Sequence, residues 1–141
     1  MCIIVFSAYD GGPFYDKLSH GRVKYLDLTI PQYGLPLYDW VMSLEVAEHI
    51  PHEFEHIYIS NIVRHAREGV VLSWAVPNQP GHGHINNQPL DYVIKTFKKQ
   101  GFGHDPKLSK QLQSKAYVGW LKKNLNVFKR LPNSTIDLND L

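Results

Sequence analysis

The sequence contains a single cysteine, Cys2, among its 141 residues, which excludes an internal disulfide framework. No apolar run approaches the roughly 20 residues that a membrane-spanning helix needs. Residues 1–6 carry neither the basic start nor the long apolar stretch of a signal peptide. Internal repeats and low-complexity linkers are also missing. We therefore expect a soluble cytoplasmic protein with no membrane partner.

The residues that are present suffice for one domain with a single core, since 43% of them are hydrophobic. We place this domain at residues 1–131 and a polar C-terminal tail at residues 132–141. Charge is distributed unevenly: residues 95–130 hold ten Lys and Arg against one acid, Asp105. This segment indicates either attraction to an anionic partner or lysines on solvated helix faces.

Short apolar runs predict β-strands, because they are nearly continuous and several end at turn signals. The first run is closed by Tyr-Asp-Gly-Gly-Pro, and we expect it to be buried on both faces. The predicted strands are residues 3–8, 22–28, 38–44, 70–76 and 126–131.

Helical periodicity separates the later strands. Pro51 opens a segment whose apolar side chains recur three or four residues apart, and residues 89–99 repeat this pattern and stop before Gly101. Residues 108–116 predict a third helix. Strands that alternate with helices indicate parallel pairing in a doubly wound α/β sheet.

Polar residues follow the first two predicted strands, at the edge where ligands bind in such sheets. The first strand is followed by Asp10, Gly11 and Gly12, and an acid there accepts hydrogen bonds from both hydroxyls of a ribose. Asp27 and Leu28 close the second strand, where an acid can meet an adenine amino group. The alternatives are a simple Asp-Gly turn for Asp10 and a helix cap for Asp27.

The third and fourth strands are followed by acids and histidines. Glu45, Glu48 and His49 fall within one turn after the third strand, and His82 and His84 follow the fourth. Such groups bind a divalent cation or serve as general acid and base. The alternative is a solvent-exposed loop, because exposed acids are common.

The motif His52-Glu53-Phe54-Glu55-His56 matches the H-E-x-x-H pattern of zinc proteases. That pattern has to lie within a helix and needs a third ligand downstream. Pro51 instead places His52 in the first helical turn, and the next acid, Glu68, precedes a strand. The sequence therefore disfavours zinc proteolysis.

Together these residues resemble the class I S-adenosylmethionine (SAM)-dependent methyltransferases. Residues 38–51 are similar to the fourth-strand motif of that family, an aspartate-initiated apolar strand followed by a Glu-Val-x-Glu-His turn. Residues 70–77, 90–101 and 124–130 look like its fifth strand, the following helix and its last strand. The resemblance implies a Rossmann-like methyltransferase fold: a mainly parallel sheet with crossover helices, here with the first strand missing.

The resemblance also implies roles for the polar edge. Methyl transfer from SAM to an oxygen acceptor would use Glu45, Glu48 and His49 as catalytic residues. A metal-assisted subset, which includes small-RNA 2′-O-methyltransferases and ubiquinone-pathway O-methyltransferases, holds a divalent cation such as Mg²⁺. The matching ligands here are Glu45, Glu48, His49 and one of His82 or His84, with His84 preferred. The implied cofactor-binding residues are Asp10, Gly11, Gly12, Asp27, Leu28 and Leu44.

The sequence departs from the family at its start. The family's first strand, its glycine-rich loop and the following helix would precede Ile3. We therefore expect weak SAM binding by a truncated domain, with a small-molecule acceptor first and RNA second. The alternative is a non-catalytic methyltransferase-like binding or scaffold domain.

Overall fold

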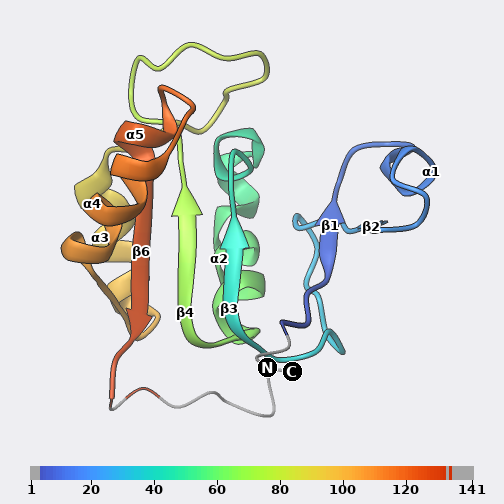
Figure 1. Cartoon of the computed structure of the whole chain (residues 1–141), viewed down its shortest axis with the longest axis horizontal. Coiled ribbons are helices and arrows are strands. Elements are labelled where there is room, and N and C mark those ends of the chain that lie inside the picture. Colours follow the sequence, from blue (N-terminus) through green and yellow to red (C-terminus); the bar gives the residue numbers. More distant parts are fainter. Residues whose placement is uncertain (1–3, 133, 135–141) are drawn as a thin grey trace.

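The computed structural model describes residues 4–132 and 134, in which strands and helices alternate along the chain and form two separate sheets (Figure 1). The small sheet pairs two strands in parallel, β1 (Ala8–Asp10) and β2 (Val23–Tyr25). The large sheet has the order β3-β4-β6-β5 and consists of β3 (Tyr38–Ser43), β4 (Ala66–Ser73), β5 (Phe102–His104) and β6 (Leu125–Arg130).

The large sheet is mixed. β3 and β4 run parallel, whereas β6 is antiparallel to both of its neighbours, β4 and β5. The predicted α/β class with a mainly parallel sheet is confirmed, because β3, β4 and β5 share one direction and only β6 runs against them. The last strand lies between β4 and β5 and runs against both.

The predicted helices are confirmed to within a few residues. The segment opened by Pro51 forms a 3₁₀ turn and then α2, which lies behind β3 and β4 in Figure 1. The Asp105 side chain caps the fourth helix by accepting a hydrogen bond from the Leu108 amide (3.0 Å). The helical elements are α1 (Tyr15–Leu18), η1 (Ala47–His49), η2 (His52–Phe54), α2 (Glu55–Arg64), α3 (Leu90–Lys99), α4 (Pro106–Lys115) and α5 (Leu121–Asn124). None of the helices in the described part of the chain is both long and apolar enough to cross a membrane.

The core lies in and around the large sheet. Tyr58 of α2 packs edge-on against Trp74, and Phe97 of α3 stacks on Phe128 of β6 at 4.5 Å between ring centres. Tyr58, Phe97 and Phe128 are fully buried. Burying large rings in this way removes most apolar surface from water and dominates the stability of a small domain.

The first predicted strand was placed wrongly. Residues 4–7 form no strand, and β1 begins only at Ala8. Ile4, Val5 and Phe6, which were expected to be buried on both faces, are 79–83% exposed. An apolar run is buried only where a neighbouring element covers it, and no described element covers this one. The fourth strand also begins earlier than predicted, at Ala66, and ends at Ser73.

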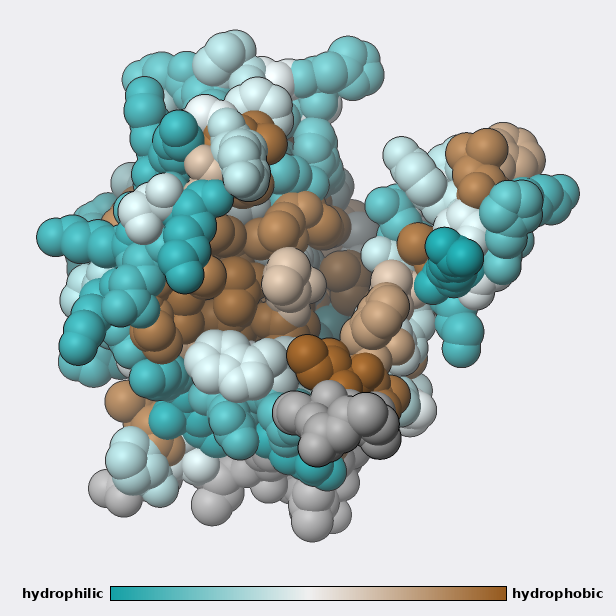
Figure 2. All heavy atoms as spheres, in the orientation of Figure 1, coloured by the Kyte–Doolittle hydropathy of each residue, from teal (hydrophilic) through white to brown (hydrophobic). Residues whose placement is uncertain are grey.

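The elements from β1 to β2 form a unit that stands beside the large sheet (Figure 1), and we call residues 8–25 the β1–β2 unit. The hydroxyl groups of Tyr9 and Tyr38 lie 3.4 Å apart across the space between β1 and β3. Within the described residues, β3 has β4 as its one strand partner. Hydrophobic residues gather on the face of the molecule that Figure 2 shows. Met42 of β3 is 67% exposed.

A buried amide ties the chain after β2 to α2. The Asn61 side chain donates hydrogen bonds to the carbonyl oxygens of Leu28 (3.2 Å) and Ile30 (2.9 Å). Its own oxygen accepts a bond from the Gln32 amide (2.8 Å). Asn61 is 3% exposed, so these three bonds satisfy a side chain that water does not reach. This contact positions the segment that leaves the β1–β2 unit.

Candidate functional site

The carboxyl ends of β3 and β4 lie at the same edge of the sheet, and the loop after β4 arches over them (Figure 1). This loop is fastened to η1, because the Glu48 carbonyl oxygen accepts bonds from the amides of Ile85 (2.9 Å) and Asn86 (3.0 Å). The turn after β3 and the loop after β4 therefore form one structural unit. Polar side chains from both converge inside it.

Glu48, His49 and His84 form the cluster. One potential ligand atom from each lies within 4.8 Å of the others. His84 Nε2 is 3.9 Å from Glu48 Oε1, and the two imidazole rings meet edge to face at 5.2 Å. Glu48 is completely buried, yet neither of its carboxylate oxygens has a hydrogen-bond partner in the described residues. Burial raises the pKa of the Glu48 carboxyl, while His49 and His84 act in the opposite direction.

Two backbone carbonyls orient the two rings. Nδ1 of His49 lies 3.0 Å from the Gly83 oxygen, and Nδ1 of His84 lies 3.3 Å from the Gln79 oxygen. A carbonyl oxygen only accepts, so each Nδ1 carries the proton and donates it. In the neutral form of each ring, Nε2 then keeps its lone pair.

Glycines make this loop conformation feasible. A Cβ atom at Gly81 would collide with the His84 ring. Gly83 adopts a left-handed φ of 72°, which places its carbonyl oxygen next to His49. The paired glycines were visible in the sequence, but their purpose depends on the ring that packs against them.

The structure does not bring Glu45 into the cluster. Glu45 has a left-handed φ of 56°, and its Oε1 accepts bonds from Ser73 Oγ (2.7 Å) and Asn124 Nδ2 (3.2 Å). The expected four-ligand set is therefore incomplete. His82 is exposed and also stays outside the group of converging side chains found among the described residues.

Ser73 and Asn124 are site residues that the sequence did not reveal. Ser73 ends β4, and Asn124 immediately precedes β6. An antiparallel β6 begins at the edge where β4 ends, so polar residues at its start belong to the same edge. The signal was the Asn124-Leu125-Asn126 sequence, but it points there only once the strand direction is known.

A second group of polar side chains, centred on Glu55, contacts the loop that carries His84. The buried Glu55 carboxylate accepts bonds from Asn86 Nδ2 (2.8 Å) and Tyr92 Oη (2.5 Å), and it lies 3.2 Å from His52 Nδ1. The hydrogen bond to Glu55 raises the pKa of the Tyr92 hydroxyl. The backbone of Asn86 also bonds to Glu48, so Glu55 helps to position the loop over the site.

The H-E-x-x-H residues do not form a zinc site. His52 and Glu53 lie in η2 and His56 in α2, and His52 contacts Glu55 instead of joining His56 around a common point. They are not among the converging groups of the described residues. His52, Glu55 and His56 instead line a cavity of about 330 Å³ that also includes Tyr92, Thr96 and Lys99 of α3.

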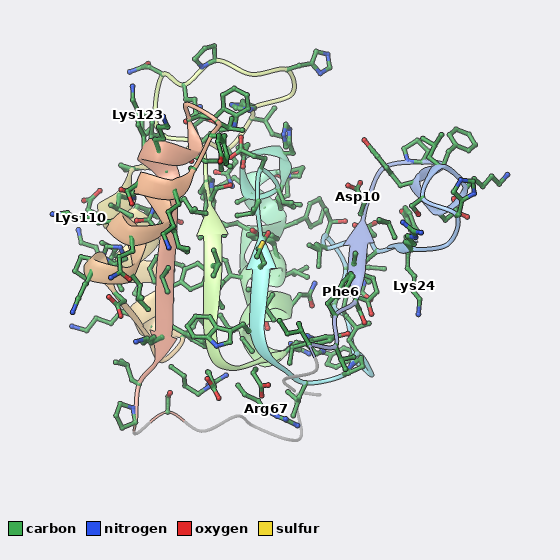
Figure 3. All side chains as sticks on the ribbon, in the orientation of Figure 1. Phe6, Asp10, Lys24, Arg67, Lys110 and Lys123 are labelled. Atoms are coloured by element: carbon green, nitrogen blue, oxygen red, sulfur yellow. The ribbon has the colours of Figure 1, made fainter. Side chains whose placement is uncertain are left out.

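Asp10 and Asp27 lie at the ends of the two strands of the small sheet. The exposed Asp10 carboxylate accepts a bond from the Gly12 amide (2.7 Å), as in an Asp-Gly turn. The Asp10 carbonyl oxygen accepts from the Leu26 amide (3.0 Å), which places Asp27 one residue further along the same edge. Figure 3 shows Asp10 at the carboxyl end of β1.

The turn at Asp27 is a local one. Its Oδ1 accepts bonds from both the hydroxyl group (2.7 Å) and the amide (2.8 Å) of Thr29. The hydrogen bond from the Thr29 hydroxyl lowers the pKa of the Asp27 carboxyl most, and the bond from the Thr29 amide lowers it further. A Cβ at Gly11 would lie 3.4 Å from the Leu26 carbonyl oxygen, which is close to an ordinary van der Waals contact. Leu28 and Leu44 are partly buried, and Leu28 packs against the core.

No protein-family model matches the sequence, and no curated protein matches it. Among solved structures, the fold is similar to that of magnesium protoporphyrin IX methyltransferase from Synechocystis PCC 6803 with bound SAH. The sequence identity is 21%, the TM-score is 0.52, and the match covers 80% of this chain and 54% of that chain. A second similar structure is that of a pericyclic reaction enzyme, with 12% sequence identity and a TM-score of 0.52. That match covers 86% of this chain and 34% of that chain.

These similarities confirm the Rossmann-like methyltransferase fold that the sequence motifs predicted. The chain spans 54% of the first of these proteins and 34% of the second. The two neighbours are named for different reactions although they share the fold. A fold accommodates many chemistries, so the reaction has to be argued from the site.

Proposed function

We propose that this chain belongs to an enzyme that transfers a methyl group from SAM to an oxygen acceptor. The observation that supports this function is that polar groups follow the carboxyl ends of the parallel strands in both sheets. Asp10 and Asp27 follow β1 and β2, and the Glu48–His49–His84 cluster follows β3 and β4. Ligands of open α/β sheets bind beyond the carboxyl ends of the strands.

Asp10 and Asp27 would hold the nucleoside of the cofactor. Asp10 is exposed beside two glycines, so a ribose can approach its carboxylate without displacing a side chain. The lowered pKa of Asp27 keeps it ionised and able to accept a bond from an adenine amino group. The residues present therefore fit a nucleoside. When bound, SAM supplies an activated methyl group.

The cluster would act on the acceptor. The reaction is an in-line displacement in which the acceptor oxygen forms a bond to the methyl carbon, the carbon–sulfur bond breaks, and the hydroxyl proton must leave. His49 is exposed, and its Nε2 keeps a lone pair that can take this proton. Glu45 would act as a positioning residue that holds the turn to Ser73 and Asn124. Alternatively, a divalent cation held by the cluster would occupy the Nε2 lone pair of His49 and would itself promote the proton loss by lowering the pKa of the hydroxyl.

The acceptor class is proposed as a small hydroxylated molecule, and one surface favours RNA as the second candidate. Tyr117 is fully exposed and Trp120 is 51% exposed in the turn before α5, where Lys122 and Lys123 are also exposed. Figure 3 shows Lys123 on α5 at the carboxyl end of β4. Aromatic faces with lysines bind single strands by stacking and by phosphate contacts. RNA binding that weakens steeply with salt and with Trp120→Ala would support this acceptor.

Calorimetric titration of the chain with SAM tests the proposal. We expect weak binding, with a Kd above the micromolar range, because the proposed contacts from Asp10 and Asp27 reach only the nucleoside. Asp10→Ala should abolish the binding, whereas Asp16→Ala, an exposed acid of the same β1–β2 unit, should leave it unchanged. Equal binding by both variants would contradict the assigned nucleoside site. A folded chain that binds no SAM at any concentration would favour the non-catalytic scaffold.

A further inference from the structure

We propose that Glu48, His49 and His84 form a three-ligand site for a first-row transition metal such as Zn²⁺ or Co²⁺, and not for Mg²⁺. The inference deepens the proposed function by naming the ion at the acceptor side of the site. Metal binding itself requires neither SAM nor an acceptor, so it can be tested alone. The argument rests on the convergence, burial and orientation of the three side chains.

The buried carboxylate calls for a partner. Both oxygens of Glu48 lack a hydrogen bond within the described residues, and the side chain is completely buried. Burying a carboxylate without a partner is costly, and folded proteins avoid it unless the group binds a cation or stays protonated. Its nearest polar atom from another side chain of the cluster, His84 Nε2, is 3.9 Å away. That separation is too long for a hydrogen bond but suits two ligands on one metal ion.

In each ring one nitrogen is left free for a metal, and in His84 that nitrogen, Nε2, lies 3.9 Å from Glu48 Oε1. With Nδ1 of His49 and of His84 each bonded to a carbonyl oxygen, Nε2 of each ring carries the free lone pair. Histidine ligands of metals are usually held in this way, with the other ring nitrogen donating to a carbonyl or carboxylate. Gly83 and Gln79 therefore already supply the outer contacts that a metal site requires.

The donor set selects the ion. Two imidazole nitrogens and one carboxylate oxygen suit zinc, cobalt and iron, whereas Mg²⁺ prefers six oxygen ligands in an octahedron. The acid that would have added a hard oxygen, Glu45, is bonded to Ser73 and Asn124. Three protein ligands leave at least one coordination position for a hydroxyl group, as in catalytic metal sites.

Thermal unfolding of chelator-treated protein with ZnCl₂, CoCl₂ or MgCl₂ tests the site. Zn²⁺ and Co²⁺ should raise the Tm in a concentration-dependent manner, because an ion that binds the folded state stabilises it by mass action, and Mg²⁺ should not. Co²⁺ should also develop visible absorption bands on binding. Glu48→Gln and His84→Ala should each weaken Co²⁺ binding at least tenfold. His82→Ala and His56→Ala are matched controls that should bind Co²⁺ as the parent chain does.

Several results would overturn the inference. Stabilisation by Mg²⁺ that disappears in Glu45→Gln would indicate a hard-cation site that includes Glu45. Loss of the Co²⁺ signal in His82→Ala or His56→Ala would place the ion elsewhere. Absence of any metal effect on a chain whose far-ultraviolet circular dichroism shows it folded would also refute it. Metal binding without SAM binding would support the metal site and contradict the proposed methyl transfer. SAM binding without metal binding would support the methyl transfer and contradict the metal site.

Discussion

Apolar residues of the large sheet and those in or just before the β1–β2 unit differ sharply in burial. The large sheet and its helices bury aromatic residues completely, among them Phe97, Phe102 and Phe128. No described residue of the β1–β2 unit is buried, and the apolar residues that lead into it are 79–83% exposed. Burial thus depends on which elements lie opposite a strand, and not on the strand's own composition. The stability of the chain should be concentrated in the large sheet.

Matched phenylalanine substitutions should expose this difference most clearly. Phe128→Ala removes a ring that stacks on Phe97, and we expect it to lower the free energy of unfolding by about 3–5 kcal/mol. Phe6→Ala removes an exposed ring and should change that free energy by less than about 0.5 kcal/mol. Urea denaturation followed by tryptophan fluorescence measures both. Similar losses for the two variants would contradict the comparison, because they would mean that residues 4–7 are buried in solution.

A matched pair of glycine substitutions tests packing within the large sheet. A Cβ at Gly69 of β4 would lie 2.8 Å from the Phe128 carbonyl oxygen and would collide with the Trp40 ring. Gly69→Ala should therefore cost about 1–3 kcal/mol through overpacking. Gly119 has no atom within 4 Å of its added Cβ, so Gly119→Ala should be nearly neutral. Thermal unfolding of the two variants gives the answer, and a neutral Gly69→Ala would show that β3 lies farther from β4 than described.

A substitution of Asn61 tests how the two regions are joined. Asn61→Ala removes three hydrogen bonds to the segment after β2, and we expect a loss of about 1–3 kcal/mol. Hydrogen exchange should accelerate at the Gln32 amide while the amides of β4 keep their protection. Gln111→Ala, an exposed change on α4, serves as the control. Uniform acceleration across both regions would mean that Asn61 supports the whole domain.

Local patterns predicted the central elements well. Residues 38–44 were predicted as a strand and β3 spans Tyr38–Ser43, while residues 89–99 were predicted as a helix and α3 spans Leu90–Lys99. In both cases the apolar period is clear, and for the helix Pro89 and Gly101 mark the boundaries. Apolar periodicity and boundary residues are local features of the sequence, so they predict an element without knowledge of the tertiary fold.

Strand direction and short strands were not predictable in the same way. β5 has only three residues, Phe102–His104, which is too short to show a period. β6 lies between β4 and β5 and runs antiparallel to both, and local periodicity encodes neither its place nor its direction. As a result, Asn124 was not assigned to the site, although it bonds to Glu45.

The candidate site was also predictable only in part. The sequence grouped the acids and histidines that follow two neighbouring strands, and the structure brings Glu48, His49 and His84 together. Glu45 was included because of its spacing, but its left-handed backbone turns the carboxylate toward Ser73. A left-handed φ at a non-glycine residue is uncommon, so spacing alone does not reveal it. The roles of all these residues in catalysis stay predictions.

β3 is an edge strand of the large sheet in the described part of the chain, and this position affects how the protein aggregates in concentrated solution. Of the six residues Tyr-Asp-Trp-Val-Met-Ser, only Asp39 carries a charge, and its side chain is 68% exposed. Strands with one unpaired edge act as templates for fibre growth, and a single charge often blocks this growth. The contact of Asp39 with Arg67, at 3.7 Å between exposed groups, contributes little to folding. We therefore expect Asp39 to limit aggregation far more than it stabilises the fold. Removal of its charge should increase the turbidity of a concentrated solution under conditions in which the chain is still folded.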